Sequence, residues 1–373
     1  MPKKRFHIRP VLLAALGAFL FLLTLKNAEI AANGIKKGIK LAANTLIPSL
    51  FPFLVLSELF LSSYTQKLIT RFFARPAHFF FGLSENGTSA LLLGWLCGVP
   101  VGAVSALTML KKRQISGAEF ERLLLFSNTP STGFLIGAVG TSLFGNQEIG
   151  IVLFCITLLV SFATGVFLKL VGGNIECTSQ MPMTLQTKMP LSSRFTQAVR
   201  HGFTTLFEVT GFVIFFSAVA ECISEIATTL LLPDLIATLL VGLLELTAGV
   251  SAAVLSHAPT HAFCLCAFFA GFSGLSICLQ IFSITAEAHP KLFPYLLSKL
   301  IGGVLSATLA YIYILVRAPI LKTAATGFAE QGSESLHLPP TITLSLAFLL
   351  ILFLLTLVST AKLKLVSFTR IEK

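Results

Sequence analysis

The sequence predicts an all-α polytopic membrane protein, built as an inverted structural repeat with two re-entrant helical hairpins and broken helices. Three observations support this fold class. Apolar residues make up 55% of the 373 residues and charged residues only 12%, whereas soluble domains average about 25% charged residues. The apolar residues gather in stretches long enough for membrane helices. The basic residues are distributed unequally around two of these stretches.

The first segment, 1–45, is predicted to contain a membrane helix followed by a connection. Lys3, Lys4, Arg5 and Arg9 precede an apolar run over 11–25. A short apolar run behind basic residues also fits a cleavable signal peptide, and this alternative stays open. We expect an uncleaved helix with a cytoplasmic N-terminus, because one extra crossing places the later charges on suitable sides of the membrane.

The remaining chain is predicted to form two membrane repeats and a separate last helix. Its apolar stretches cover 46–63, 88–110, 122–145, 149–171, 201–223, 235–255, 262–287, 292–316 and 341–361. The first repeat is assigned to 46–171 and the second, inverted repeat to 201–316, with a cytoplasmic linker over 172–200 between them. An external loop and a C-terminal membrane helix occupy 317–373, which places the C-terminus in the cytoplasm.

The stretch 88–110 is predicted to be a re-entrant hairpin that enters and leaves the membrane on the cytoplasmic side. Basic residues flank it on both sides, so a simple crossing would leave one group outside. These residues are Lys67, Arg71, Arg75, Lys111, Lys112 and Arg113. The centre, 94–102, reads GWLCGVPVG, a composition that interrupts a helix.

The stretch 235–255 is predicted to be the matching hairpin, centred on ELTAG at 245–249. Its flanks, 224–234 and 256–261, contain neither Lys nor Arg, so we expect this hairpin to open outward. Two hairpins that enter from opposite sides define an inverted repeat. The motif Phe-x-x-Gly-x-x-Gly, which occurs at 134–140 and at 268–274, adds weak internal symmetry.

The positions of several basic residues oppose this topology, because the topology would place them on the outer side of the membrane. These are Lys26, Lys36, Lys37, Lys40, Arg317 and Lys322.

Polar residues and helix-breaking residues at membrane depth are the candidate substrate-binding residues, because polar groups there are costly. The segment SNTPSTG at 127–133 interrupts one apolar stretch, and GLSICLQ at 274–280 is its counterpart in the second half. The predicted set comprises Gly98, Pro100, Gly102, Asn128, Thr129, Ser131, Glu245, Thr247, Gly274, Ser276 and Gln280. Broken helices expose backbone groups that can bind a polar solute. The same side chains could instead join helices by hydrogen bonds, and this alternative stays open.

Several function classes are excluded by the motifs that the sequence lacks. It has no Walker loop, HExxH or GxSxG motif, so we expect neither an enzyme nor catalytic residues. No basic run interleaved with aromatic residues indicates a nucleic-acid partner. His257 and His261 are separated by Pro259, and the seven cysteines lack CxxC spacing, so we expect no metal and no cofactor.

Six segments of the sequence resemble the sporulation integral membrane proteins of the YlbJ type. They are LIPSLFPF at 46–53, GVPVG at 98–102, the stretch 115–128 that ends in ERLLLFSN, GAVG at 137–140, ELTAG at 245–249 and GLSICLQ at 274–280. The resemblance extends from about residue 10 to 316, in matching order and spacing.

This resemblance implies a nucleoside-recognition, or Gate, domain and a role in endospore formation in a Gram-positive-type bacterium. The sequence departs from the family pattern at Thr129-Pro130-Ser131-Thr132, which is richer in hydroxyl groups, and at Cys278, where the family pattern has His. A Gate-domain resemblance does not by itself identify a nucleoside as ligand.

Two hypotheses for the function follow. The first is a carrier or channel-like transporter of a small polar solute in the cell membrane during sporulation. The second is a non-transporting membrane scaffold required for assembly of the spore envelope. The expected partners are the lipid bilayer, an unidentified small polar solute and either a second copy of the chain or other sporulation membrane proteins.

Overall fold

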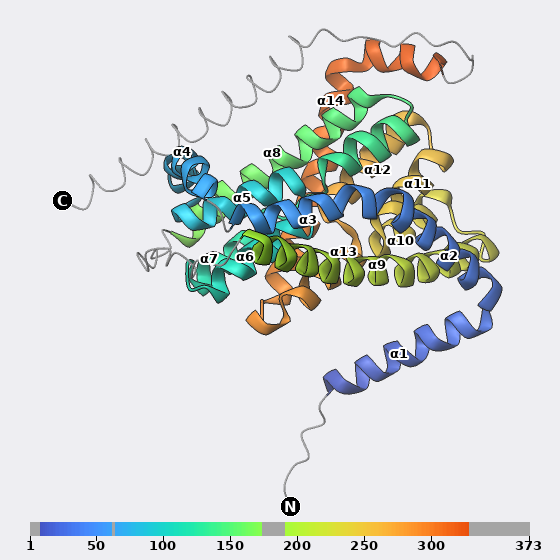
Figure 1. Ribbon diagram of the computed structural model, residues 1–373. Helices are drawn as coiled ribbons and strands as arrows, with labels where there is room; N and C mark the ends of the chain where they lie inside the picture. The colour runs from blue at the N-terminus through green and yellow to red at the C-terminus, as the bar shows by residue number, and fades with distance from the viewer. Residues whose placement is uncertain (1–7, 62–63, 174–190, 328–373) are drawn as a thin grey trace, which may run out of the picture.

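The computed structural model describes residues 8–61, 64–173 and 191–327, and these residues form helices joined by turns and short breaks (Figure 1). Within these ranges there is no β-strand, which confirms the all-α prediction. The predicted last helix, 341–361, lies outside the described residues.

Four described helical segments are long and apolar enough to cross a membrane. They are Gln147–Gly172 in α8 (Gln147–Gly172), Ser192–Thr229 in α9 (Leu191–Thr229), Pro259–Ile284 in α12 (Pro259–Phe272) and α13 (Gly274–Ile284), and Leu292–Val316 in α14 (Leu292–Gly327). A span needs about 20 residues. These segments agree with the predicted membrane protein.

The N-terminal region is more helical than the sequence analysis predicted. After α1 (Ile8–Lys26), the expected connection is a second helix, α2 (Ala28–Leu41), which continues through the π-helix η1 (Ala42–Leu46) into α3 (Ile47–Leu61). A Cβ atom on Gly34 would lie 2.7 Å from the Ala218 Cα in α9, and one on Gly38 would lie 2.9 Å from the Ile214 Cα. These two glycines allow α2 to pack closely on α9.

The stretch 88–110 folds as a helical hairpin that breaks where the sequence predicted. Following α4 (Tyr64–Phe81), helices α5 (Glu85–Cys97) and α6 (Val101–Lys111) are separated by the segment 98–100. A Cβ atom on Gly102 would lie 2.8 Å from the Gly94 Cα, so the two helices cross at these glycines. Each helix is roughly 15–20 Å long, too short to cross a 30 Å hydrocarbon core alone.

The stretch 235–255 forms a second hairpin of the same construction. Helices α10 (Asp234–Leu244) and α11 (Leu246–Ser256) meet at Glu245, as predicted. Gly242 and Gly249 form the crossing, because a Cβ atom on Gly249 would collide with the Gly242 Cα.

Each hairpin is followed by a broken helix. The first consists of α7 (Gly117–Phe126) and the π-helix η2 (Gly133–Leu143), with the break at 127–132. The second consists of α12 (Pro259–Phe272) and α13 (Gly274–Ile284), and Ser273 and Gly274 both have a φ of 74° at its break. The repeated Phe-x-x-Gly-x-x-Gly motif does not mark equivalent positions, because it follows the first break but precedes the second.

Two predicted boundaries differ from the structure. Helix α9 begins at Leu191, so the last part of the predicted linker 172–200 is helical. Helix α14 continues to Gly327 across the predicted start of a loop at 317. The segment 317–327 contains Pro319 and two threonines beside Ala, Leu and Lys, so its composition alone does not explain why the helix continues past its apolar part.

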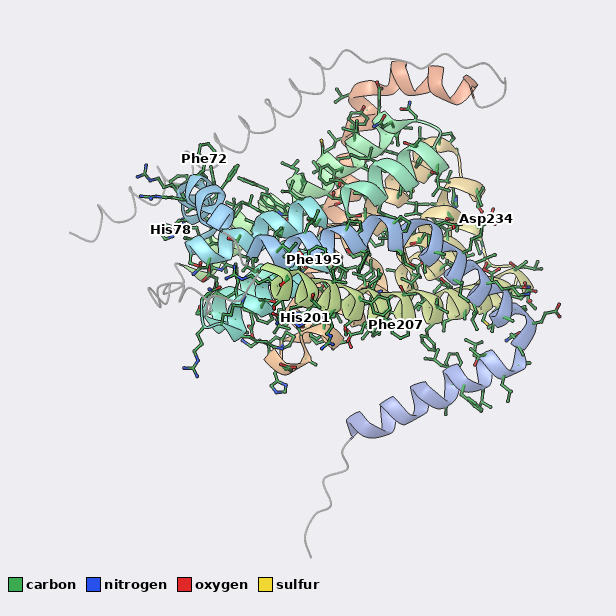
Figure 2. All side chains as sticks on the ribbon, viewed as in Figure 1. Phe72, His78, Phe195, His201, Phe207 and Asp234 are labelled. Carbon is green, nitrogen blue, oxygen red and sulfur yellow. The ribbon has the colours of Figure 1, made fainter. Side chains whose placement is uncertain are left out.

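The helices give the molecule two opposite ends. In Figure 2, Phe72 and His78 of α4 lie at one end, Asp234 at the start of α10 lies at the other, and Phe195, His201 and Phe207 follow α9 between them. Three buried apolar clusters of described residues form the core. One lies around the first hairpin and α7, the second around α11, α12 and η2, and a small third one joins α1, α2 and α9.

Candidate substrate-binding site

The buried carboxyl end of α7 binds side chains from two other helices. A helix leaves its last carbonyl groups without intrahelical partners, so a buried end needs other donors. The Ser298 hydroxyl of α14 donates to the Leu125 carbonyl at 2.9 Å. The Ser161 hydroxyl of α8 donates to the Phe126 carbonyl. The first break therefore lies where α7, α8 and α14 meet.

Lys299 of α14 reaches the same break. Its ammonium group donates to the Asn128 carbonyl, and Nζ lies 5.8 Å from the centre of the Tyr295 ring. The residue is only 6% exposed, within the candidate span Leu292–Val316. None of the ion pairs in the described part of the chain involves Lys299. A cation without a counter-ion in a membrane span is costly, which by default marks a functional residue.

A small polar cavity lies beside Lys299 and Asn128. Its volume is about 30 Å³, which is enough for about one or two water molecules. Among the described residues, Asn128 Oδ1, Thr129 Oγ1 and Ser306 Oγ are buried atoms without a hydrogen-bond partner. All three residues line the cavity. Buried polar groups are normally bonded, so these atoms are available to a ligand.

The predicted residues of the first half come together at this break. The Val99 N–H donates to the Thr129 carbonyl at 2.9 Å, which joins the hairpin tip to the break. A Cβ atom on Gly98 would lie 2.5 Å from the Ser131 nitrogen, and one on Gly102 would lie 3.1 Å from Asn128 Oδ1. Pro100 is buried at the same tip.

Two of these residues also have structural partners. The Asn128 amide donates to the Leu124 carbonyl at 3.1 Å. The Ser131 hydroxyl accepts from the Phe134 N–H at 3.2 Å, at the start of η2.

The predicted residues of the second half form a separate group. Glu245 is 2% exposed, and its carboxylate accepts from the Ala248 N–H at 2.6 Å as the N-cap of α11. Thr247 lies in the first turn of that helix. A Cβ atom on Gly274 would lie 3.0 Å from the Leu246 nitrogen, so the second break also contacts a hairpin tip.

Ser276 and Gln280 are buried on one face of α13, where the Gln280 amide donates to the Ser276 hydroxyl at 3.4 Å. Neither residue lines the Lys299 cavity. Gly271, three residues before Gly274, does line it, so the two groups adjoin along α12.

Sequence reasoning missed Lys299, although the signal was present. It is a lone cation inside the apolar stretch 292–316. The rule that singled out Glu245 applies equally to Lys299. Ser298 and Ser306 lie one residue before and seven residues after Lys299. They were missed because hydroxyl side chains are common in membrane helices, so these two serines did not stand out from their surroundings in the sequence.

A larger cavity, of about 410 Å³, opens between α3, α6 and α9. Its charged lining residues are Glu58, Lys111, Lys112, Arg194, His201 and Glu208. His201 Nδ1 lies 3.9 Å from Glu58 Oε1. Basic groups therefore outnumber acidic groups in this cavity.

The described residues contain no cluster of three or more His, Cys, Asp or Glu side chains that could hold a metal. His257 instead shares a hydrogen bond of 2.9 Å with the Thr238 hydroxyl. Cys97, Cys222, Cys266 and Cys278 are buried thiols.

Comparison with known proteins gives one informative relative. No family model and no solved structure matches the chain, so the Gate domain stays a prediction. The chain is similar to the "Sporulation integral membrane protein YlbJ" of Bacillus subtilis (strain 168), with 27% identity over 337 residues. The alignment covers 80% of this chain and 81% of the relative. Together with the apolar helices, this similarity supports assigning the chain to the YlbJ type of sporulation integral membrane protein.

Proposed function

We propose that this protein is a carrier or channel-like transporter that moves a small solute with negative charge across a membrane during sporulation. The role in sporulation rests on the similarity to the YlbJ protein. The transport role rests on the site around Lys299, and the proposal involves no catalytic step.

The observation that carries the proposal is Lys299 without a carboxylate partner among the described residues. The hydroxyl groups of Thr129 and Ser306 are unpaired donors in the same cavity. A cation and two hydroxyl donors complement an anion, such as a carboxylate, better than a neutral or positively charged solute.

Two features support passage of the solute rather than permanent binding. The cavity of about 30 Å³ is too small for an organic solute, so a transport cycle has to open it. The surrounding hairpins and broken helices are the kind of elements that move against each other in transporters. The larger cavity, with its excess of basic side chains, offers an anion a favourable electrostatic environment.

The test is solute uptake by the purified full-length protein in proteoliposomes. The solutes compared are an aromatic dicarboxylate, uncharged nucleosides and divalent cations. We expect uptake of the anion, and we expect Lys299→Met to lower it by roughly 30-fold or more, because loss of one buried charged partner weakens binding by several kcal/mol. Met has a similar volume and adds no unpaired charge.

The matched control is Lys291→Met, because Lys291 is exposed and pairs with Glu121 at 3.1 Å just before α14. It should leave uptake unchanged. If neither the native protein nor the variants move any of the solutes, while Lys299→Met still abolishes heat-resistant spores, the scaffold hypothesis is favoured. Equal uptake by Lys299→Met and Lys291→Met would remove Lys299 from the solute path.

A further inference from the structure

Helix α4 has the composition of a helix that lies on a membrane rather than across it. It contains Arg71 and Arg75 among aromatic residues, and it is not one of the described helices that are apolar enough to span. A helix with one basic and one aromatic face is typical of the membrane–water interface.

One side of α4 is fixed to the protein. Thr70, Ala77 and Phe81 are buried, and the Thr70 and Ser89 hydroxyl oxygens are 2.7 Å apart. The Arg122 guanidinium of α7 donates to the Phe81 carbonyl at 3.0 Å. These contacts fix the rotation of α4 about its own axis. Its remaining residues therefore face away from the protein in a fixed direction.

The remaining surface of α4 is exposed and has two adjacent faces. Arg71 and Arg75 are one helical turn apart, both are exposed, and neither forms an ion pair with a carboxylate in the described ranges. Phe72, on the neighbouring face, is 77% exposed. In Figure 2 its side chain lies at the outer end of the molecule.

The orientation of α4 agrees with this surface. In Figure 1, α4 is viewed nearly along its axis, whereas α3 and α9 run lengthwise across the same view. Because α9 contains a candidate span, a helix that crosses it steeply at the end of the molecule lies roughly parallel to the membrane plane.

We propose that α4 lies in the membrane–water interface and binds anionic phospholipid headgroups through Arg71 and Arg75, while Phe72 enters the acyl region. A guanidinium group binds phosphate through two parallel hydrogen bonds, and two such groups one turn apart present a site with no internal counter-ion. This inference does not depend on the proposed transport function.

The first test is lipid affinity of the full-length protein in neutral detergent, measured by native mass spectrometry with phosphatidylglycerol and with phosphatidylcholine. Near an anionic surface each basic residue contributes roughly fivefold, so Arg71→Gln/Arg75→Gln should weaken phosphatidylglycerol binding by roughly 30-fold. The control is Lys36→Gln/Lys40→Gln, which removes two exposed cations with the same spacing from α2. Equal phosphatidylglycerol affinity of these two variants would overturn the proposal.

The second test locates Phe72 with Phe72→Trp in a Trp95→Phe background, reconstituted in vesicles that contain phosphatidylglycerol. Quenching of the new tryptophan by lipids brominated in the acyl chain, with little quenching by aqueous iodide, is the expected result. Strong iodide quenching would show that this face is exposed to water rather than to the acyl chains, and it would overturn the interfacial position.

Discussion

At the scale of single residues, close contacts at glycines determine where the hairpins cross. Gly94 contacts both the Gly102 Cα and the Ser127 carbonyl oxygen, so a side chain there would collide with the partner helix and with the first break. Gly137, in η2, has no atom within 4 Å of the position its Cβ would take. The sequence analysis gave Gly137 a role in a repeated motif and placed Gly94 in the helix-breaking centre of the first hairpin, without predicting that the two helices cross there.

We therefore expect Gly94→Ala to lower the free energy of unfolding by about 1–3 kcal/mol, because overpacking moves the helices apart. Gly137→Ala should have little effect and serves as the control. Thermal unfolding of the detergent-solubilised protein measures both. Equal stability of the two variants would mean that α5 and α6 do not cross at Gly94.

Glu245 provides a second prediction at this scale. Its carboxylate caps α11, and loss of a capping oxygen costs about 1 kcal/mol. Glu245→Gln keeps an acceptor oxygen and should preserve the amount of folded protein, whereas Glu245→Leu should reduce it. Membrane fractions quantified by immunoblot measure this difference.

The same Gln variant separates capping from solute contact. If Glu245 only caps α11, spores of Glu245→Gln should have normal heat resistance. Loss of resistance at a normal protein level would indicate that the negative charge itself is required.

At the scale of the elements, the sequence located the helix breaks better than the helix ends. The break at 98–100 contains Gly and Pro, the break at 127–132 contains Ser, Asn and Pro, and the break at 245 lies in the predicted centre of the second hairpin. The predicted break at 274–280 is instead the start of helix α13, and the interruption lies at Ser273, which has a positive φ. Helices α2 and α4 were missed because neither is uniformly apolar. Both are amphipathic, and their helical structure depends on a face packed against other helices.

The arrangement of the elements bears on topology. Lys37, one of the basic residues that opposed the predicted topology, pairs with Glu221 of α9 at 2.6 Å. This pairing gives Lys37 a counter-ion within the protein. Because the positive-inside rule counts basic residues and not net charge, Lys37 still opposes the predicted topology.

We expect single cysteines in a Cys-less background to be labelled from opposite sides of the membrane at Arg113→Cys and Ser256→Cys. Arg113 follows α6 in a basic turn, whereas Ser256 ends α11 beside a segment without Lys or Arg. Impermeant maleimide applied to intact cells and to inverted vesicles makes the comparison. Labelling of both positions from the same side would contradict the inverted repeat.

At the scale of the whole molecule, the two predicted halves share a large contact surface. Helix α3 of the first repeat and α2 of the N-terminal segment pack on α9 of the second repeat, and α8 packs on α14. The Lys299 site itself joins the halves, because its cation comes from α14 and its carbonyl partner from the break after α7.

The halves should therefore assemble when they are expressed as separate chains, 1–182 and 183–373. Co-purification through a tag on one half measures this association. A split inside α8, after residue 160, is the control and should prevent assembly, because it interrupts a helix that contacts both halves. Separately stable halves that do not co-purify would contradict the observed packing.

The sequence by itself determined the membrane environment, the helical class and the helix breaks at 98–100, 127–132 and 245. These properties depend on local composition: apolar stretches need lipid, and Gly-Pro segments or Asn-Thr-Pro segments interrupt hydrogen bonding within a helix. It also identified Asn128 and Thr129 as site candidates, since both are polar in an apolar stretch.

Only the tertiary structure decided which polar groups share a site. Asn128 and Lys299 are 171 residues apart, and the cation could be recognised as lacking a counter-ion only when all its described neighbours were known. Tertiary structure likewise separated Glu245, which caps its own helix, from the Lys299 cavity. The physical reason is that the cost of a buried charge depends on its partners in space, and helix packing brings together partners that are distant in sequence.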